Sequence, residues 1–306
     1  TMDLKNKCLW AITISALVTP ALAHAETDPR DYEALVALPN NTAVAVGYYR
    51  HISAASAQSY SADLALFRGA YILRFGNLSV APVDVVLPVA DEAIYVPAAA
   101  GSPASLTVHA AGLGDFLYFP TVGYLIPQDE INHTYIAFTP YFSFPTGQYD
   151  PTHPVNIGTH RAYFEQELAV GQRFLKIVNL ELIGNVTEYL DNSSFDTAAG
   201  TSVVQGTLQQ KATLGGVFHA SVDVSQSLYF AASFYVTAYG QESFVYAPAS
   251  INAVAVNQQT VETLRFGMGI RLEPRTLLLL QYNQDVGESN GAPITQFIGA
   301  RISHLF

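Results

Sequence analysis

The chain ends with Ile294-Thr-Gln-Phe-Ile-Gly-Ala-Arg-Ile-Ser-His-Leu-Phe306, whose pattern indicates the architecture of the whole protein. One parity of this stretch carries Ile294, Ile298, Ala300, Ile302 and Phe306, whereas the other carries Thr295, Gly299, Arg301 and Ser303. A period of two with one apolar face predicts a β-strand. Because a strand that ends on an exposed aromatic residue would be a poor sheet edge in water, we expect it to close a barrel, with Phe306 in the aromatic girdle at a membrane interface.

The composition agrees with strands rather than helices as membrane-spanning elements. Of the 306 residues, 50% are hydrophobic and 13% are charged, against about 25% charged in an average soluble protein. After the first residues the chain has no run of about 18 apolar residues, which a membrane-spanning helix requires. The 18 Tyr and 17 Phe, against one Trp, suit interface girdles, although a soluble β-sandwich could share them.

The first 41 residues predict an exported protein. Residues 1–25 have the features of a cleaved signal peptide: Lys5 and Lys7, an apolar stretch from Leu9 to Val18, and a small-residue site at Ala23-His-Ala25. The alternative is a membrane anchor, for which the segment is short. We expect residues 26–41 to be a polar periplasmic lead-in and residues 42–306 to form the barrel. The only cysteine, Cys8, lies in the signal peptide, so the mature chain would have no disulfide.

Period-two alternation recurs along the rest of the chain. It predicts twelve strands over residues 42–54, 64–75, 78–88, 113–125, 133–145, 160–170, 175–189, 206–219, 227–240, 260–272, 276–285 and 294–306. Links after odd strands are long and polar, as in 89–111, 190–205 and 241–259, whereas links after even strands are short, as in Gly76-Asn77 and Gly171-Gln-Arg173. Outer-membrane barrels sort their links in this way, with short turns on the periplasmic side. The third strand is expected to turn Ala81 outward.

These features predict an all-β fold. It is a single closed, up-and-down, antiparallel transmembrane β-barrel of about 12 strands with a polar lumen, preceded by a helical signal peptide. Closure is needed because an unpaired backbone group in hydrocarbon costs several kcal/mol. The predicted location is the bacterial outer membrane.

Charged side chains on the predicted inner face are the first candidate functional residues. They are Arg68, Arg74, Arg161, Lys211, Arg265, Arg271 and Arg301, which face Asp84, Asp115, Glu165, Glu167 and Glu181. They could line a solute pathway and set its charge preference, as charged rings do in channels. Alternatively, they form a structural ladder of ion pairs that fills the lumen.

Inward tyrosines are the second group, and they comprise Tyr49, Tyr135, Tyr141, Tyr163, Tyr229, Tyr235 and Tyr239. Their rings could stack on a flat aromatic substrate, or they could fill space and hydrogen-bond to neighbours. The sequence has no Gly-x-Ser-x-Gly element and no tight histidine spacing for a metal. We therefore predict no catalytic residues, no metal and no cofactor. The net charge of −11 argues against nucleic acid as a partner.

A series of motifs resembles one family of outer-membrane proteins. The series is Gly112-Leu-Gly-Asp115, Phe138-Thr-Pro140, Phe144-Pro-Thr-Gly-Gln-Tyr-Asp150, Asn156-Ile-Gly158 with Arg161, Leu278-Leu-Leu-Gln-Tyr282, and Asp285-Val286. In this order it resembles the family of outer-membrane transporters named for the "meta-pathway of phenol degradation", over about 32–306. The resemblance implies a channel or transporter for small molecules, aromatic or otherwise hydrophobic.

The expected partners follow from this interpretation. They are outer-membrane lipid, a small-molecule solute, and the periplasmic chaperones and barrel-assembly machinery, which would act on the C-terminal strand ending in Phe306. Two other functions stay open: a structural or receptor-type barrel with a plugged lumen, and an outer-membrane lipid hydrolase.

Overall fold

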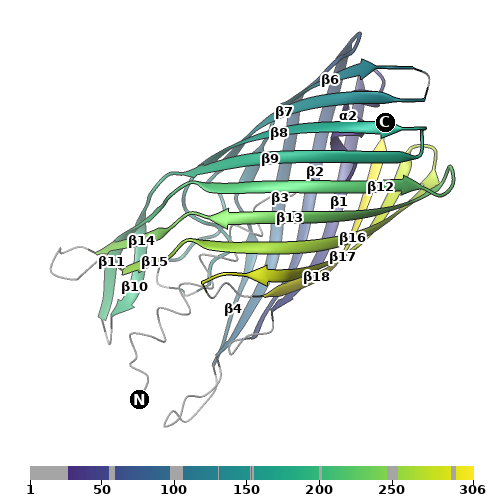
Figure 1. Ribbon diagram of the computed structural model, residues 1–306. Helices are drawn as coiled ribbons and strands as arrows, with labels where there is room; N and C mark the ends of the chain where they lie inside the picture. The colour runs from purple at the N-terminus through teal and green to yellow at the C-terminus, as the bar shows by residue number, and fades with distance from the viewer. Residues whose placement is uncertain are drawn as a thin grey trace.

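The computed structural model describes residues 27–54, 59–96, 106–129, 131–151, 153, 155–199, 202–246, 254–290 and 294–306. The predicted signal peptide lies outside these residues. In the described part of the chain, one antiparallel sheet closes on itself as a barrel with twelve wall positions (Figure 1). The same residues contain no helix that is long and apolar enough to cross a membrane.

The wall strands follow one another in chain order. They are β1 (Thr42–Ala54), β2 (Ser59–Phe75), β3 (Leu78–Val96), a broken run of β4 (Leu106–Leu113), β5 (Phe116–Tyr118) and β6 (Thr121–Pro127), then β7 (His133–Phe144), β8 (Tyr163–Phe174), β9 (Val178–Tyr189), β12 (Thr213–Asp223), β13 (Leu228–Tyr239), β16 (Gln259–Glu273), β17 (Thr276–Glu288) and β18 (Thr295–Leu305). A second sheet of β10 (Asn192–Ala199), β11 (Ser202–Gln210), β14 (Glu242–Tyr246) and β15 (Val254–Val256) projects beyond one end of the barrel (Figure 1).

The last strand closes the barrel as the sequence predicts. β18 pairs antiparallel with β1, in a register that runs from Val44 opposite Leu305 to Ala54 opposite Thr295. The backbone N–H of Phe306 donates to the carbonyl of Ala43 at 2.9 Å. Joining the first and last strands removes both sheet edges, which is the condition for a sheet to cross lipid.

The two faces of the wall differ as a membrane barrel requires. Large apolar side chains are exposed on the outside; they include Phe67, Leu168, Leu182, Phe266 and Ile298. Short turns such as 175–177 and 274–275 gather at the end of the barrel where the chain terminates, and the longer connections lie at the opposite end (Figure 1). This apolar belt and the sorted links identify a membrane-spanning barrel of the outer-membrane type, with its short turns on the periplasmic side.

Three local predictions are wrong. The loop predicted over 89–111 is largely strand, because β3 and β4 continue their pairing beyond the belt, from Val89 opposite Leu113 to Val96 opposite Leu106. The single strand predicted over 113–125 is broken near Gly114 and Pro120 into the ends of β4, β5 and β6. The links 190–205 and 241–259 likewise contain the strands of the projecting sheet.

Two further errors concern the direction of one side chain and the position of one turn. Ala81 is fully buried inside rather than turned outward, because the β2–β3 register shifts between Tyr71 and Leu73. The turn predicted at Gly171-Gln-Arg173 is part of β8, and the chain turns at Leu175 and Lys176, which have φ values of 52° and 60°. Gly171 lies beneath the ring of Tyr135 on the neighbouring strand, where a Cβ would come within 2.0 Å of the ring. Its role is therefore to make room rather than to turn.

Candidate functional site

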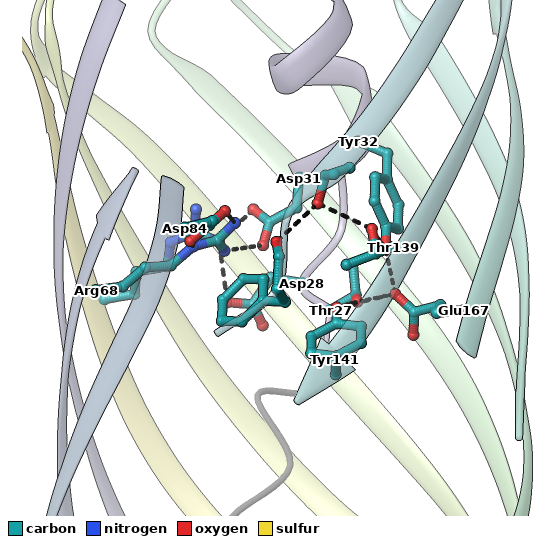
Figure 2. Close-up of polar contacts among 12 residues, drawn as sticks. Thr27, Asp28, Asp31, Tyr32, Arg68, Asp84, Thr139, Tyr141 and Glu167 are labelled. Atoms are coloured by element: carbon teal, nitrogen blue, oxygen red, sulfur yellow. Dashed lines mark hydrogen bonds and ion pairs between the residues drawn. The ribbon is translucent and has the colours of Figure 1, made fainter. Parts of the chain in front are cut away.

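The N-terminal segment lies inside the barrel, which corrects the prediction of a periplasmic lead-in over 26–41. Helix α2 (Asp31–Ala37) runs within the lumen near the short-turn end, and the residues before it lie deeper (Figures 1 and 2). Its acidic residues, Asp31 and Glu33, are in the first turn, where they suit the helix dipole. The helix packs on the wall at Gly123, where a Cβ would lie 2.6 Å from Cγ1 of Val36.

Three arginines of the wall and three aspartates form a ladder of alternating charge across the lumen. Asp28 is fully buried and accepts from Arg265 at 3.3 Å and from Arg301 at 3.0 Å. Arg301 also donates to Asp31 at 2.6 Å, and Asp31 lies 3.4 Å from Arg68. Arg68 in turn holds Asp84 in a two-point contact at 2.8 and 2.7 Å (Figure 2). The charges balance within the ladder, as buried charges must.

A second group of contacts centres on Glu167, a buried carboxylate of β8. Thr27 donates to its Oε1 at 2.7 Å and Tyr141 donates to the same atom at 3.1 Å. The hydroxyl of Tyr32 on α2 also contacts this oxygen, and it lies 2.8 Å from Oγ1 of Thr139 (Figure 2). These hydroxyls satisfy a carboxylate that the ladder leaves unpaired.

A third group of contacts attaches the first turn of α2 to the periplasmic end of the wall. Arg173 contacts both oxygens of Glu33, with Nη2 at 2.8 Å from Oε2. Asn179 donates to Glu33 at 2.7 Å. The hydroxyl of Tyr135 donates to Glu181 at 2.9 Å and accepts from Nδ2 of Asn179 at 3.1 Å. The described N-terminal segment is thus attached to the wall at three places, each through at least one carboxylate.

The other half of the lumen, toward the long connections, contains a large apolar cluster beside buried charges such as Arg50 and Glu92. The inner faces of β1, β2, β3 and β5 contribute a buried cluster that we call the apolar inner wall; its members include Ile52, Leu64, Leu66, Val86, Ile94 and Leu117. Val155 and Ile157, from the segment between β7 and β8, pack against it. The lumen is therefore polar as predicted, and this cluster adds an apolar surface to its inner face.

At the long-connection end, buried charges hold loops rather than line an open path. Asp115 accepts backbone N–H groups from Gly147 at 2.8 Å and Thr159 at 2.7 Å. The guanidinium of Arg161 lies 4.5 Å from the ring centre of Tyr189 and 3.9 Å from a carboxylate oxygen of Glu242 in the projecting sheet. Burial raises the pKa of Glu242 to about 7, although the charge of Arg161 opposes this shift.

The remaining predicted residues are scattered. Glu165 accepts from Thr187 at 2.6 Å, and the ring of Tyr235 lies 4.3 Å beneath the guanidinium of Arg265. Tyr163 is buried in the apolar inner wall and Tyr239 is half-buried.

Some of the predicted residues lie away from the centre of the lumen. Arg74 is at the periplasmic rim, with Nη1 at 3.4 Å from the carbonyl of Ala37, and Arg271 is exposed at the mouth of a cavity at the same end. Two directions are wrong. Lys211 is exposed between β11 and β12, because the predicted strand is interrupted there, and Tyr49 points outward because its neighbour Tyr48 takes the inner position.

Ser233, His219 and Glu181 lie in the order of a catalytic triad, which bears on the hydrolase alternative. Nδ1 of His219 lies 2.6 Å from Oγ of Ser233, and Nε2 lies 3.9 Å from Oε2 of Glu181. The latter distance is too long for a hydrogen bond, and all three side chains are buried within the wall. A substrate carbonyl therefore cannot approach this serine. The described residues contain no group of three or more His, Cys, Asp or Glu that could hold a metal ion.

The N-terminal segment supplies residues that strand alternation does not predict, namely Thr27, Asp28, Asp31, Tyr32 and Glu33. A signal was present: Tyr32, Leu35 and Val36 have the spacing of one apolar helix face, and that face is buried in the structure. Its acidic residues also complement the inward arginines that the sequence analysis had already found.

Comparison with known proteins gives both a family and a fold. A family model described as "Putative MetA-pathway of phenol degradation" matches residues 38–302. The chain is similar to the COG4313 outer membrane channel from Pseudomonas putida F1, with 19% identity and a TM-score of 0.76, over 92% of this chain and 100% of that one. At this level of identity the likeness shows a shared barrel fold.

Two more distant structures have TM-scores below 0.5. The Pseudomonas putida toluene transporter TodX has 9% identity and a TM-score of 0.47, over 90% of this chain and 93% of that one. The translocator domain of autotransporter NalP from Neisseria meningitidis has 10% identity and a TM-score of 0.46, over 95% and 98%. No curated protein matches the chain.

Proposed function

The chain belongs to the family described by the phenol-degradation model, and we propose that it is an outer-membrane channel for small hydrophobic molecules, aromatic ones among them. The observation that carries this proposal is the apolar inner wall. A channel for hydrophilic solutes has a polar, water-filled interior. An inner surface of Leu, Ile and Val instead favours solutes that gain free energy by leaving water.

The segment 27–41 acts in this proposal as an internal plug. It joins the wall through the Asp28, Glu167 and Glu33 contacts, and several of the charges that the sequence suggested as a selectivity filter hold it, namely Arg68, Arg265, Arg301 and Glu167. We therefore favour the ladder of ion pairs as a device for positioning the segment. A lipid hydrolase is not proposed, because Ser233 and His219 are closed to substrate.

Uptake measurements test the channel. Gram-negative cells that display the protein should accumulate radiolabelled toluene faster than cells without it, whereas uptake of a labelled disaccharide should change little. Replacing two residues of the apolar inner wall, L64N with L66N, should slow toluene accumulation several-fold, because the path then presents amide groups to an apolar solute.

The matched control is S61N, which changes a half-buried polar residue on the same strand. Heat-modifiable migration on gels establishes that each variant folds. Toluene uptake that is equal in wild type, L64N/L66N and S61N would contradict the proposal, as would a large gain in disaccharide uptake by the wild-type protein.

A further inference from the structure

A separate cavity lies at the periplasmic end of the barrel, between α2 and the wall. Its volume is about 410 Å³, which falls within the range of small-molecule sites. Apolar side chains cover much of its surface; they include Ala34, Leu38, Val44, Ile72, Leu277 and Leu305. The cavity meets the apolar inner wall at Val44 and Val46, whereas Ile52, Leu64 and Ile94 of that wall lie farther toward the long connections.

The acidic side chains of this cavity already have cationic partners. Asp31 and Asp84 are held by Arg68, and Glu33 is held by Arg173. Asp223 pairs with Arg30 at 2.7 Å and with Arg173 at 2.6 Å. No carboxylate of the lining is therefore left to neutralise a further cation.

Two more arginines, Arg271 and Arg275, lie at the mouth of the cavity and are not neutralised by these carboxylates. Arg271 ends the inner face of β16, and Arg275 lies on the turn to β17; both are exposed and both line the cavity. Within the described ranges, neither side chain has an ion pair or a hydrogen bond. Glu273, which is exposed at the end of β16, does not line the cavity. The mouth thus has positive charge next to an apolar surface.

We propose that this cavity binds small amphipathic anions, in which a carboxylate is attached to an aromatic or short aliphatic body. The carboxylate pairs with Arg271 and Arg275, which offer the planar donor arrangement that carboxylates match. The apolar body lies against α2 and the inner faces of β1 and β17. The inference rests on the proposed channel function and deepens it, since it adds carboxylated aromatic compounds to the substrates and gives them a binding site at the periplasmic exit.

The test uses two probes that differ in charge. Full-length protein in nanodiscs of zwitterionic lipid is titrated with 4-(trifluoromethyl)benzoate and with 4-(trifluoromethyl)benzyl alcohol, and binding is followed by fluorine NMR. The benzoate should bind about tenfold more tightly than the alcohol at low salt. This preference should shrink at about 1 M salt, where charges are screened within about 3 Å. Equal affinity for the two probes would overturn the proposal.

Variants locate the binding. R271Q/R275Q should lower affinity for the benzoate about tenfold and leave affinity for the alcohol unchanged. K176Q removes an exposed cation from another periplasmic turn and should alter neither, and E273Q should leave benzoate binding equal or stronger. A34F, which fills the cavity from α2, should weaken both probes. Benzoate affinity that is the same in R271Q/R275Q as in wild type would overturn the proposal.

Uptake separates this inference from the channel proposal. If the protein admits toluene but R271Q/R275Q binds benzoate normally, the anion site is refuted and the channel stands. If benzoate binding depends on both arginines but no hydrophobic solute enters cells, the site stands and the channel function fails.

Discussion

At the scale of single residues, the lumen depends on carboxylates that the N-terminal segment brings to arginines of the wall. Asp28 is completely buried between Arg265 and Arg301. By contrast, Asp91 pairs with His109 at 2.5 Å on the surface, where both side chains are 57% exposed. Breaking a buried pair costs about 3–5 kcal/mol, because the remaining charge stays in the interior. Exposed pairs contribute about 0–1 kcal/mol.

We therefore expect D28N to loosen the plug. The substitution leaves Arg265 and Arg301 close together without their shared anion, so the attachment of the segment should weaken by about 3–5 kcal/mol. Single-channel conductance in planar bilayers should rise, and the N-terminal segment should become sensitive to protease. D91N, the surface counterpart, should change neither. Equal conductance in D28N and wild type would mean that the ladder does not hold the segment.

At the scale of elements, the position of α2 depends on close packing against β6. A Cβ built on Gly123 would lie 2.6 Å from Val36 and 3.0 Å from Leu35 of the helix, closer than side-chain carbons approach each other in packed interiors. A Cβ on Gly184 of β9, in contrast, would meet nothing within 4 Å. The sequence around Gly123 thus makes room for an element that the strand pattern alone does not reveal.

G123V should therefore displace the helix while the barrel remains closed. Overpacking of this kind costs about 1–3 kcal/mol, which the barrel can avoid if α2 moves away from the wall. Conductance should increase and heat-modifiable migration should be retained. G184V, whose side chain faces outward, serves as the control with the same change in volume. A G123V channel with wild-type conductance would show that the helix tolerates the substitution in place.

The projecting sheet should respond to pH through Glu242. The pKa of this carboxyl group is raised by burial from 4.5 to about 7, so the folded sheet binds a proton more strongly than the unfolded segment. The stability that protonated Glu242 contributes to the folded sheet is fully present below pH 4.5 and is lost as the pH rises through about 7. Hydrogen exchange of β14 amides, corrected for the intrinsic rate, should show greater protection at pH 5 than at pH 8. E242Q should abolish the difference and E188Q, at an exposed site, should keep it; a pH-independent wild type would contradict the assignment.

At the scale of the whole molecule, the sequence predicts the wall far better than its contents. Alternation from Ile298 to Ser303 places each side chain on its face, because the two sides of a membrane strand meet lipid and lumen. The irregular places depend on tertiary contacts, as when Gly171 makes room for Tyr135 or the β2–β3 register shift turns Ala81 inward. The plug was missed because a seven-residue helix gives a weak periodic signal, and many of its partners, such as Glu167 for Thr27, lie more than 100 residues away in the chain.

The last prediction concerns the contact that joins the last strand, β18, to the first strand, β1. Phe306 is 67% exposed, and its backbone donates to Ala43 beyond the last strand residue. The aromatic ring is therefore free to contact another molecule at the periplasmic interface. Because the bond to Ala43 is made by the backbone, loss of the ring should leave the β1–β18 pairing intact. If the barrel-assembly machinery binds this strand end, F306S should slow the appearance of the heat-modifiable form several-fold without lowering the stability of barrels once they have formed.

The control for this experiment is F75S, which removes another exposed aromatic residue near the periplasmic end. Both variants lose a similar apolar surface, so a general effect of that loss should slow them equally. Slower assembly of F306S alone would mark the chain terminus as the recognised feature. Equal rates for F306S and wild type would show that the pairing of β18 with β1 suffices for assembly, and that Phe306 contributes only its contact with lipid.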